Sequence, residues 1–175
     1  VVSSNELLDA DLRAVHQRFP KLAVLNRAVP GLSSLCFGAD HGQGGRLAAR
    51  ALVAHGHRDI AVIAGDARAD DNIARLAGFH AELAGHGLRV HETLRAGGDF
   101  SFDGGSRAAL TLLQAGRRFS ALFAANDQMA MAALAVFAAH GLRVPLDVSV
   151  IGYDDSDLAA YTTPALSTVR IPITE

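Results

Sequence analysis

The 175-residue chain has a nearly even charge balance, with 16 basic and 18 acidic residues and a formal net charge of −2. Half of its residues are hydrophobic and 19% are charged, a composition typical of a folded globular protein. Because so balanced a chain attracts phosphates only weakly, we do not expect this segment to hold DNA by itself. No apolar run approaches the roughly 18 residues that a membrane-spanning helix needs, so no membrane partner is expected.

The chain has a single cysteine, Cys36, which lies in the apolar stretch Leu35–Phe37. We expect it to be a buried small hydrophobic residue. With one cysteine no internal disulfide can form, which suits a reducing compartment, and we expect a cytoplasmic protein.

Short apolar segments alternate with amphipathic ones along the chain. In chain order, apolar residues at helical spacing predict helices at 7–18, 44–55, 73–86, 105–115 and 128–140, and apolar runs predict strands at 22–25, 34–37, 60–63, 90–94, 121–124 and 148–151. Strands such as Ile60–Ile63 and Val148–Ile151 lack polar alternation, which indicates that both faces of their sheet are covered. The sequence therefore predicts an α/β fold with a parallel sheet.

A histidine–glycine pair recurs where three of the predicted helices end, at Ala54–Arg58, Gly85–Arg89 and Ala139–Arg143. We expect each glycine to take the left-handed conformation that closes a helix, and each histidine to meet the free carbonyls of the last turn. The alternative is a histidine metal site. Zinc needs ligands that converge on one point, whereas these histidines lie at three different helices, so we expect no metal and no cofactor.

Motifs of nucleotide-binding proteins and hydrolases are incomplete or absent. Gly42, Gly44 and Gly45 lie where a dinucleotide fingerprint belongs, but Leu47 stands at the position of its last glycine. We expect these glycines to let the chain turn into a helix that is capped by Asp40. No G-x-x-x-x-G-K-[ST] and no G-x-S-x-G sequence occurs.

The acidic pair Asp154–Asp155 is the remaining alternative for catalysis, because neighbouring carboxylates can do acid–base work. Successive residues tend to point in different directions, so we do not expect the two to share one site. No catalytic residue is assigned, and we do not expect an enzyme.

Polar side chains follow nearly every predicted strand. They are Asn26 and Arg27 after the first, Asp70, Asp71, Asn72 and Arg75 after the third, the loop 97–99 and Phe100 after the fourth, Asn126 and Asp127 after the fifth, and Asp154 and Asp155 after the sixth. Ligands of open α/β sheets bind beyond the carboxyl ends of the strands, so these side chains can meet a hydroxyl-rich small molecule. The alternative is that they cap helices, which we favour for Asp40 and Asp127. Arg75 opposes the dipole of its helix, so we expect it to have a carboxylate or ligand partner.

Four blocks of the sequence resemble the core of the LacI/GalR family of bacterial transcriptional regulators. They are ALVAHGHRDIAVIAG (Ala51–Gly65), RLAGFHAEL (Arg75–Leu83), ALFAANDQMAMAAL (Ala121–Leu134) and GLRVPLDVSVIGYDDSDLAAYTTPALSTV (Gly141–Val169). The similarity starts near Leu22, and it is closer to these repressors than to the periplasmic sugar-binding proteins that share their fold. It implies two Rossmann-like subdomains with parallel sheets and an effector cleft between them, the N-terminal subdomain being incomplete in this chain.

The resemblance also implies a domain organisation. Residues 1–38 and 164–175 would be parts of the N-terminal subdomain, and residues 39–163 would form the C-terminal subdomain. Family members bind operator DNA as homodimers through an N-terminal helix-turn-helix, which is absent from this chain. We therefore expect the chain to be a piece of a longer protein.

Carried over position by position, the resemblance assigns the ligand-binding residues Asn26, Asp71, Arg75, Phe100, Asn126 and Asp154. Arg75 and Asp154 match an arginine and an acidic residue that contact the effector, and Phe100 matches an aromatic residue that lies against the ligand ring. Asp71 is a departure, because some members have a small hydroxyl residue there. Its carboxylate would either narrow the pocket or pair with Arg75.

The sequence thus predicts an effector sensor, most simply a sugar-responsive repressor, with a pentose, a hexose, a sugar acid or a purine as alternative effectors. A second hypothesis is a periplasmic sugar-binding protein of a transporter, which a signal peptide would support and a helix-turn-helix would exclude. A third is an enzyme on a related α/β fold, which would lack a nucleophile, a metal set and a phosphate loop.

Overall fold

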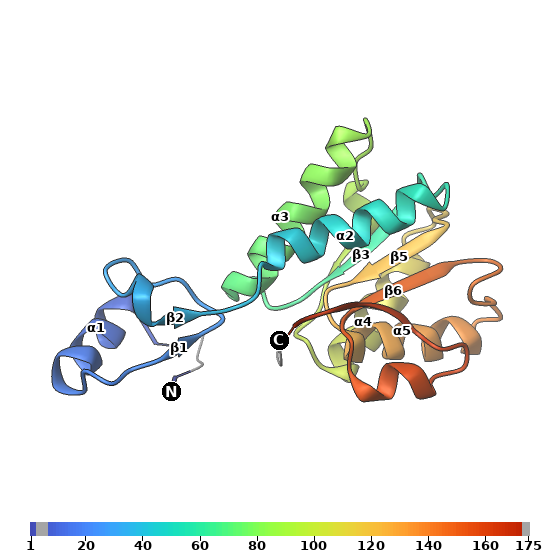
Figure 1. Cartoon of the computed structure of the whole chain (residues 1–175). Helices are drawn as coiled ribbons and strands as arrows, with labels where there is room; N and C mark the ends of the chain where they lie inside the picture. The colour runs from blue at the N-terminus through green and yellow to red at the C-terminus, as the bar shows by residue number, and fades with distance from the viewer. Residues whose placement is uncertain (3–6, 173–175) are drawn as a thin grey trace.

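The computed structural model describes residues 1–2 and 7–172, which form a small N-terminal unit and a larger α/β unit (Figure 1). The small unit contains helix α1 (Asp9–Arg18), a 3-10 turn (Ser33–Leu35) and the parallel strands β1 (Val24–Leu25) and β2 (Cys36–Phe37). Val2 forms a parallel bridge with Val24 on the other side of β1. Buried apolar residues, Leu12 and Val24 among them, give this unit a core of its own.

The larger unit is built on a five-stranded sheet with the strand order β4-β3-β5-β6-β7, in which all pairs are parallel. Its strands are β3 (Ile60–Ala64), β4 (Arg95–Gly97), β5 (Ala121–Ala124), β6 (Ser149–Asp154) and β7 (Ser167–Arg170). The predicted α/β fold with parallel sheets is confirmed.

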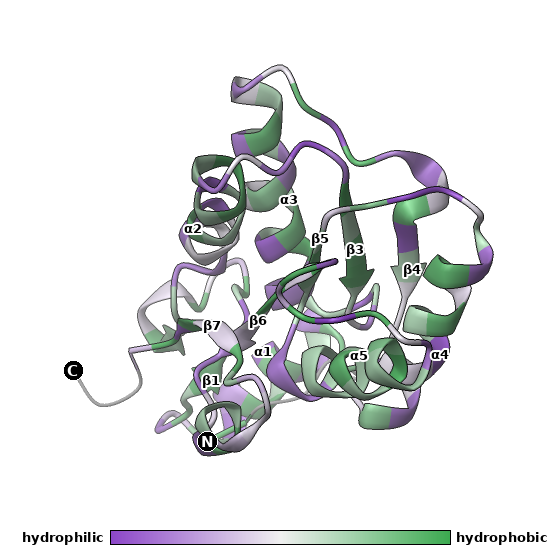
Figure 2. Ribbon diagram, turned by 90° about the vertical axis from the view of Figure 1, so that its right-hand side faces the viewer, coloured by the Kyte–Doolittle hydropathy of each residue, from purple (hydrophilic) through white to green (hydrophobic). Residues whose placement is uncertain are grey.

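Helices cover both faces of this sheet. Helices α2 (His41–Ala54) and α3 (Asp70–Gly85) pack on one face, and α4 (Phe102–Gln114) and α5 (Asp127–Ala139) pack on the other (Figure 1). The central strands are strongly hydrophobic between these two layers (Figure 2), and every residue of β5 is fully buried. A strand enclosed in this way needs apolar residues on both faces, which explains its unbroken apolar sequence. In the described part of the chain, no helix is long and apolar enough to cross a membrane.

Helices α2 and α4 begin three residues earlier than expected and α5 begins one residue earlier, and a polar side chain caps each of these three helices. Asp40 accepts a hydrogen bond from the backbone N–H of the third residue of α2 (2.7 Å), as predicted, and Ser101 caps α4 in the same way. The cap of α5 is Asn126, so the prediction that Asp127 caps this helix was wrong. Asp127 is instead buried, and its carboxylate accepts hydrogen bonds from Ser156 and Thr168.

The strand predicted at 90–94 was also wrong. Residues Glu92–Leu94 form a 3-10 turn, and β4 follows at Arg95–Gly97. Leu94 of this turn and Val90 before it are buried as strand residues would be, so buried apolar positions alone did not distinguish a turn from a strand.

The segment 164–175 was assigned to the N-terminal subdomain, but the structure places most of its described part elsewhere. Strand β7 (Ser167–Arg170) pairs with β6 and forms an edge of the larger sheet. Its buried Val169 belongs to the core of that unit. Residues 173–175 lie outside the described part of the chain.

The predicted glycine helix ends are confirmed, and the expected contact of the histidine with last-turn carbonyls is found for two of the three histidines. Residues His55, His86 and His140 are the C-caps of α2, α3 and α5, and Gly56, Gly87 and Gly141 follow with φ of +86°, +70° and +77°. The imidazole Nδ1 atoms of His55 and His140 lie 2.8 Å from carbonyl oxygens of the last turn, whereas the His86 ring lies near Glu82. Cys36 was expected to be buried, but it is only half-buried. Its thiol donates a hydrogen bond to the backbone carbonyl of Leu32 in the small unit.

Helices α2 and α3 cross at very close range through glycines. Gly42, Gly44 and Gly45 were expected to form the turn that precedes helix α2. They lie instead inside its first turns. A Cβ on Gly45 would overlap the backbone carbonyl of Arg75, and a Cβ on Gly78 would overlap the carbonyl of Gly42. The absence of side chains at these glycines therefore allows the short distance between the backbones of α2 and α3, and this distance determines the position of Arg75.

We expect Gly45→Ala to destabilise the protein by about 1–3 kcal/mol, because the added methyl group must push α3 away from α2. The measurement is urea denaturation of both proteins. The matched control is Gly85→Ala, in the last turn of α3, where a Cβ meets no atom within 4 Å. A Gly45→Ala variant as stable as Gly85→Ala would contradict the close crossing.

Candidate functional site

The order of the strands creates a point at which consecutive connections leave the sheet in opposite directions. From β3 the chain moves outward to β4, then returns to β5 on the other side of β3. Ligands of open α/β sheets bind beyond the carboxyl ends of the strands at such a point. The loops that follow β3 and β5 therefore define the first place to look for a site.

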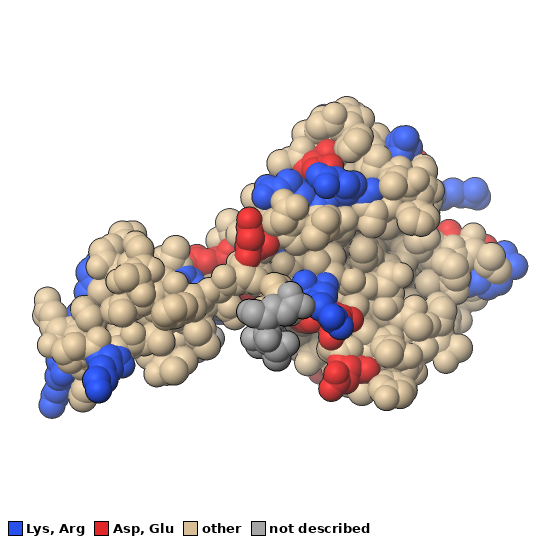
Figure 3. All heavy atoms as spheres, in the orientation of Figure 1, with Lys and Arg blue, Asp and Glu red and all other residues tan. Residues whose placement is uncertain are grey.

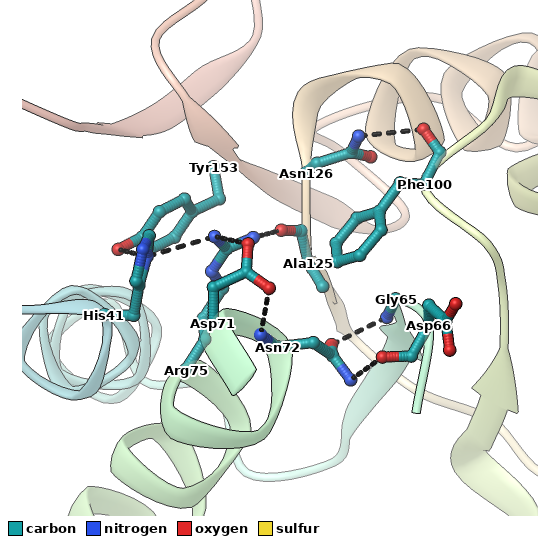
Figure 4. A network of polar contacts seen from close by, with 10 residues as sticks. All are labelled: His41, Gly65, Asp66, Asp71, Asn72, Arg75, Phe100, Ala125, Asn126 and Tyr153. Carbon is teal, nitrogen blue, oxygen red and sulfur yellow. Dashed lines mark hydrogen bonds and ion pairs between the residues drawn. The ribbon is translucent and has the colours of Figure 1, made fainter. Parts of the chain in front are cut away.

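A cavity of about 190 Å³ lies at this end of the sheet, and its lining residues are Asp71, Arg75, Phe100, Asn126 and Asp154. These are five of the six residues that the sequence predicted. They come from helix α3, the loop after β4, the residue that caps α5, and the end of β6. Figure 4 draws Asp71, Arg75, Phe100 and Asn126 of this set. Residues far apart in the chain thus converge on one small hollow.

Arg75 is the floor of this cavity and is only 1% exposed. One terminal nitrogen of its guanidinium donates to the backbone carbonyl of Ala125, and the other lies 3.6 Å from the carboxylate of Asp71. The predicted carboxylate partner of Arg75 is therefore Asp71, one helical turn away. A buried cation held by a carboxylate and a carbonyl is a fixed part of the scaffold.

The ring of Tyr153 covers one face of this guanidinium, 3.6 Å from its central carbon. The Nδ1 atom of His41 lies 3.2 Å from Arg75 and 3.3 Å from the Tyr153 hydroxyl. Since a guanidinium only donates, Nδ1 of His41 must accept, and the imidazole is neutral. Burial and the neighbouring positive charge of Arg75 both lower the pKa of His41, which favours the same neutral form.

Asn126 and Phe100 form the opposite wall. The amide of Asn126 donates to the backbone carbonyl of Phe100 (2.9 Å), and its side-chain oxygen caps α5. Phe100 has φ of +67°, an uncommon conformation for a bulky residue, which this hydrogen bond helps to hold. Its ring packs against Gly65, where a Cβ would overlap it. The side-chain oxygen of buried Asn72 accepts a hydrogen bond from the N–H of Gly65 and so holds the start of the loop after β3.

Asp154 ends strand β6 beside the cavity, whereas the next residue, Asp155, pairs with Arg170 at 2.6 Å. The two adjacent carboxylates therefore serve different sites, as expected. Burial raises the pKa of Asp154 to about 6, with the repulsion of Asp127 and Asp71 adding to the rise and the attraction of Arg75 opposing it. Asp154 is thus a half-buried carboxylate that is charged at neutral pH at some cost.

Asn26, the sixth predicted residue, is not in this cavity. It is exposed at the end of β1, with φ of +56°, and it lines a larger hollow of about 820 Å³ between the small unit and helices α2 and α3. Asp71 lines both hollows. The structure thus brings Asn26 to a space next to the other five.

The sequence did not point to His41, which lies 3.2 Å from a terminal nitrogen of Arg75, or to Tyr153, whose ring covers a face of the guanidinium. His41 directly follows the cap residue of α2, and Tyr153 lies inside the motif that supplied Asp154. The available signal was the pair Gly44–Gly45, because a Cβ on Gly44 would overlap the Tyr153 ring. A sequence pattern does not show which residue uses such a gap.

The arrangement offers oriented hydrogen-bonding groups and one aromatic face, which together suit a polar ring. Asp154 supplies an acceptor, Asn126 supplies an amide, and Phe100 supplies an apolar surface. Among residues 1–2 and 7–172, no group of three or more His, Cys, Asp or Glu is placed to hold a metal ion. The fold and this cavity define a ligand-binding α/β unit of the periplasmic-binding-protein type.

Comparison with known proteins agrees with this class. The family model of the periplasmic binding protein-like domain matches residues 49–175. The HTH-type transcriptional regulator AscG of Escherichia coli K12 is 42% identical over 154 residues, which is 88% of this chain and 46% of AscG. The HTH-type transcriptional regulator GalS of Salmonella typhimurium LT2 is 36% identical over 173 residues, 99% of this chain and 51% of GalS.

Solved structures give the same result. A LacI-family transcriptional regulator from Burkholderia phymatum superposes with a TM-score of 0.93 and 49% identity, over 98% of this chain and 62% of that one. The complex of the regulator CelR with cellobiose has a TM-score of 0.76 and 38% identity, over 87% of this chain and 43% of that one. The chain belongs to the LacI/GalR family of transcriptional regulators, which confirms the resemblance found in the sequence. It spans about half the length of the curated relatives that it matches.

We expect Asp154→Asn to raise the melting temperature at pH 8. The folded-state pKa of Asp154 is raised from 3.8 to about 6, so the folded protein binds more protons between about pH 4 and 6, and the charged carboxylate destabilises it above this range. Asparagine has nearly the same shape as aspartate, so the substitution keeps the side-chain volume at a position whose backbone φ is 121°. Each recovered kcal/mol should add roughly 2–4 °C.

The gain should shrink as the pH is lowered to 5, because the wild-type carboxyl is then largely protonated. Thermal unfolding at both pH values measures the difference. Glu92→Gln, an exposed change at the other end of the sheet, is the control and should alter the melting temperature little. An Asp154→Asn protein no more stable than the wild type at pH 8 would show that the charge carries no cost.

Proposed function

We propose that this chain is the effector-binding core of a DNA-binding transcriptional regulator, a repressor, and that a small molecule, most simply a sugar, occupies the cavity above Arg75. The observation that carries this proposal is the convergence of Asp71, Arg75, Phe100, Asn126 and Asp154 on one cavity at the point where the strand order reverses. Buried, oriented polar groups beside an aromatic ring are suited to select a polar ring.

The small unit gives the effector a second surface to contact. We assign residues 1–38 to the N-terminal subdomain and residues 39–163 to the C-terminal one, with Asn26 facing the C-terminal subdomain across the larger hollow. An effector that touches both surfaces stabilises the arrangement in which they are close. Because it binds this arrangement better than the open one, it shifts the population and thereby changes the spacing of the DNA-binding heads.

Operator DNA is bound, in this proposal, by a helix-turn-helix headpiece outside the present chain, and the full-length protein acts in the cytoplasm as a homodimer. The face visible in Figure 3 has acidic and basic groups intermixed, which agrees with a core that does not itself bind DNA. Relatives named as transcriptional regulators favour this function over transport or catalysis, and the CelR–cellobiose complex favours a sugar as effector.

We expect a sugar or polyol to raise the melting temperature of the full-length protein that contains this chain. A ligand at 100 times its Kd adds about 2.7 kcal/mol of stability. The same ligand should change the affinity for DNA upstream of the regulated genes, measured by fluorescence anisotropy. No turnover of the ligand is expected.

Arg75→Ala and Phe100→Ala should each weaken ligand binding at least about tenfold, the factor that corresponds to 1.4 kcal/mol. The first removes the group that holds Asp71, His41 and Ala125 together, and the second removes the aromatic wall. Two variants are needed because loss of buried Arg75 can unfold the protein, and circular dichroism checks this. Glu92→Gln is the control. DNA binding that is unaffected by every ligand tested would contradict the proposal.

A further inference from the structure

The charges that line the cavity do not balance. Asp71 and Asp154 contribute two carboxylates and Arg75 contributes one guanidinium, so the formal net charge of the lining is −1. The pair Asp71–Arg75 is held at 3.6 Å, which leaves Asp154 as the excess charge. A third carboxylate, that of Asp127, is near enough to repel Asp154 and is itself fixed by hydroxyl donors.

The terminal nitrogens of Arg75 are not free to bind an anion through two parallel hydrogen bonds. Arginine binds carboxylates and phosphates best by offering two parallel N–H groups to two oxygens. In Arg75, one terminal nitrogen donates to Ala125, the other contacts His41 and Asp71, and Tyr153 covers a face. The Nε atom is buried and has no hydrogen-bond partner within the described chain. An incoming anion would have to break these contacts to reach a two-pronged geometry.

Asp154, in contrast, is available to a ligand. No hydrogen bond from any described residue reaches its side chain, although it is half-buried beside the cavity. An ionised carboxylate only accepts, so its partner must donate a hydrogen bond. Hydroxyl and ammonium groups can do this, whereas a carboxylate or phosphate on the ligand would face a like charge at short range.

We propose that this cavity selects uncharged or cationic polyhydroxy ligands, such as a sugar or an amino sugar, and rejects sugar acids and sugar phosphates, because Asp71 and Asp154 outweigh an Arg75 whose two terminal nitrogens already contact Ala125, His41 and Asp71. This rests on the proposed function and names the class of small molecule that the site takes. Asp71 offsets the charge of Arg75 and Asp154 receives a ligand donor, so both residues determine specificity by charge.

The first test compares matched ligands on the full-length protein by calorimetry at pH 7, where the amine of an amino sugar is largely protonated and Asp154 is largely ionised. The uncharged sugar that gives the largest shift in melting temperature is compared with the uronic acid and the amino sugar of the same ring. We expect the acid to bind at least about tenfold more weakly than the uncharged sugar, a difference of 1.4 kcal/mol or more. An acid that binds as tightly as its uncharged counterpart would overturn the proposal.

The second test does not depend on which sugar is the effector. Inorganic phosphate is titrated against chloride at constant ionic strength, and thermal unfolding is followed in the wild type, in the double variant Asp71→Asn/Asp154→Asn, and in Glu92→Gln. The double change turns the net charge of the lining from −1 to +1. We expect it to strengthen phosphate binding at least about tenfold relative to both other proteins.

Equal phosphate binding in all three proteins would overturn the charge selection, and binding at other surface sites cancels in this comparison. The two proposals fail separately. If no sugar binds but the double variant alone gains phosphate affinity, the sugar-sensing function is wrong and the charge selection stands. If sugars bind and control DNA affinity but their acids bind equally well, the function stands and the charge selection is wrong.

Discussion

The site depends on how one buried cation is held. Arg75 has almost no contact with solvent, and a buried charge is tolerated only when its donors find acceptors. The acceptors come from the carbonyl that follows β5, from Asp71 one turn earlier on α3, and from His41 at the start of α2. This single side chain therefore ties both helices of one layer to the end of a central strand, and the cavity is the space left above it.

The close crossing of α2 and α3 is what makes this arrangement possible. Without side chains on Gly45 and Gly78, the two helix backbones touch, and without one on Gly44 the ring of Tyr153 can lie beside α2 and over the guanidinium. Any bulkier residue at these positions would move α3, and Arg75 with it. Gly44 and Gly45, which do not complete a nucleotide-binding motif, thus have a structural role, because they allow Arg75 and Tyr153 to lie in contact.

The sequence was sufficient for the α/β fold and the helix ends, because these depend on local pattern. The rule that parallel strands end at the same edge gave a larger set of polar candidates, and the resemblance to the LacI/GalR family selected from it the five residues that line the cavity. It was insufficient where tertiary packing decides. The turn at Glu92–Leu94 buries Leu94 as a strand would, Asn126 rather than its neighbour caps α5, and β7 pairs with β6 at the edge of the larger sheet. No sequence motif marks His41, and its position beside Arg75 results from the packing of α2 against α3.

The same features explain how a common scaffold can acquire its own ligand preference. The guanidinium of Arg75 and the amide of Asn126 are held by hydrogen bonds to backbone carbonyls, so their replacement would leave these carbonyls without a partner. Asp71 and Asp154 have looser attachments and determine the sign of the charge that a ligand meets. A change from acid to amide at either position leaves the shape of the cavity nearly the same but alters its electrostatics. Charge selection is therefore the property of this site that substitution can change most easily without loss of the fold.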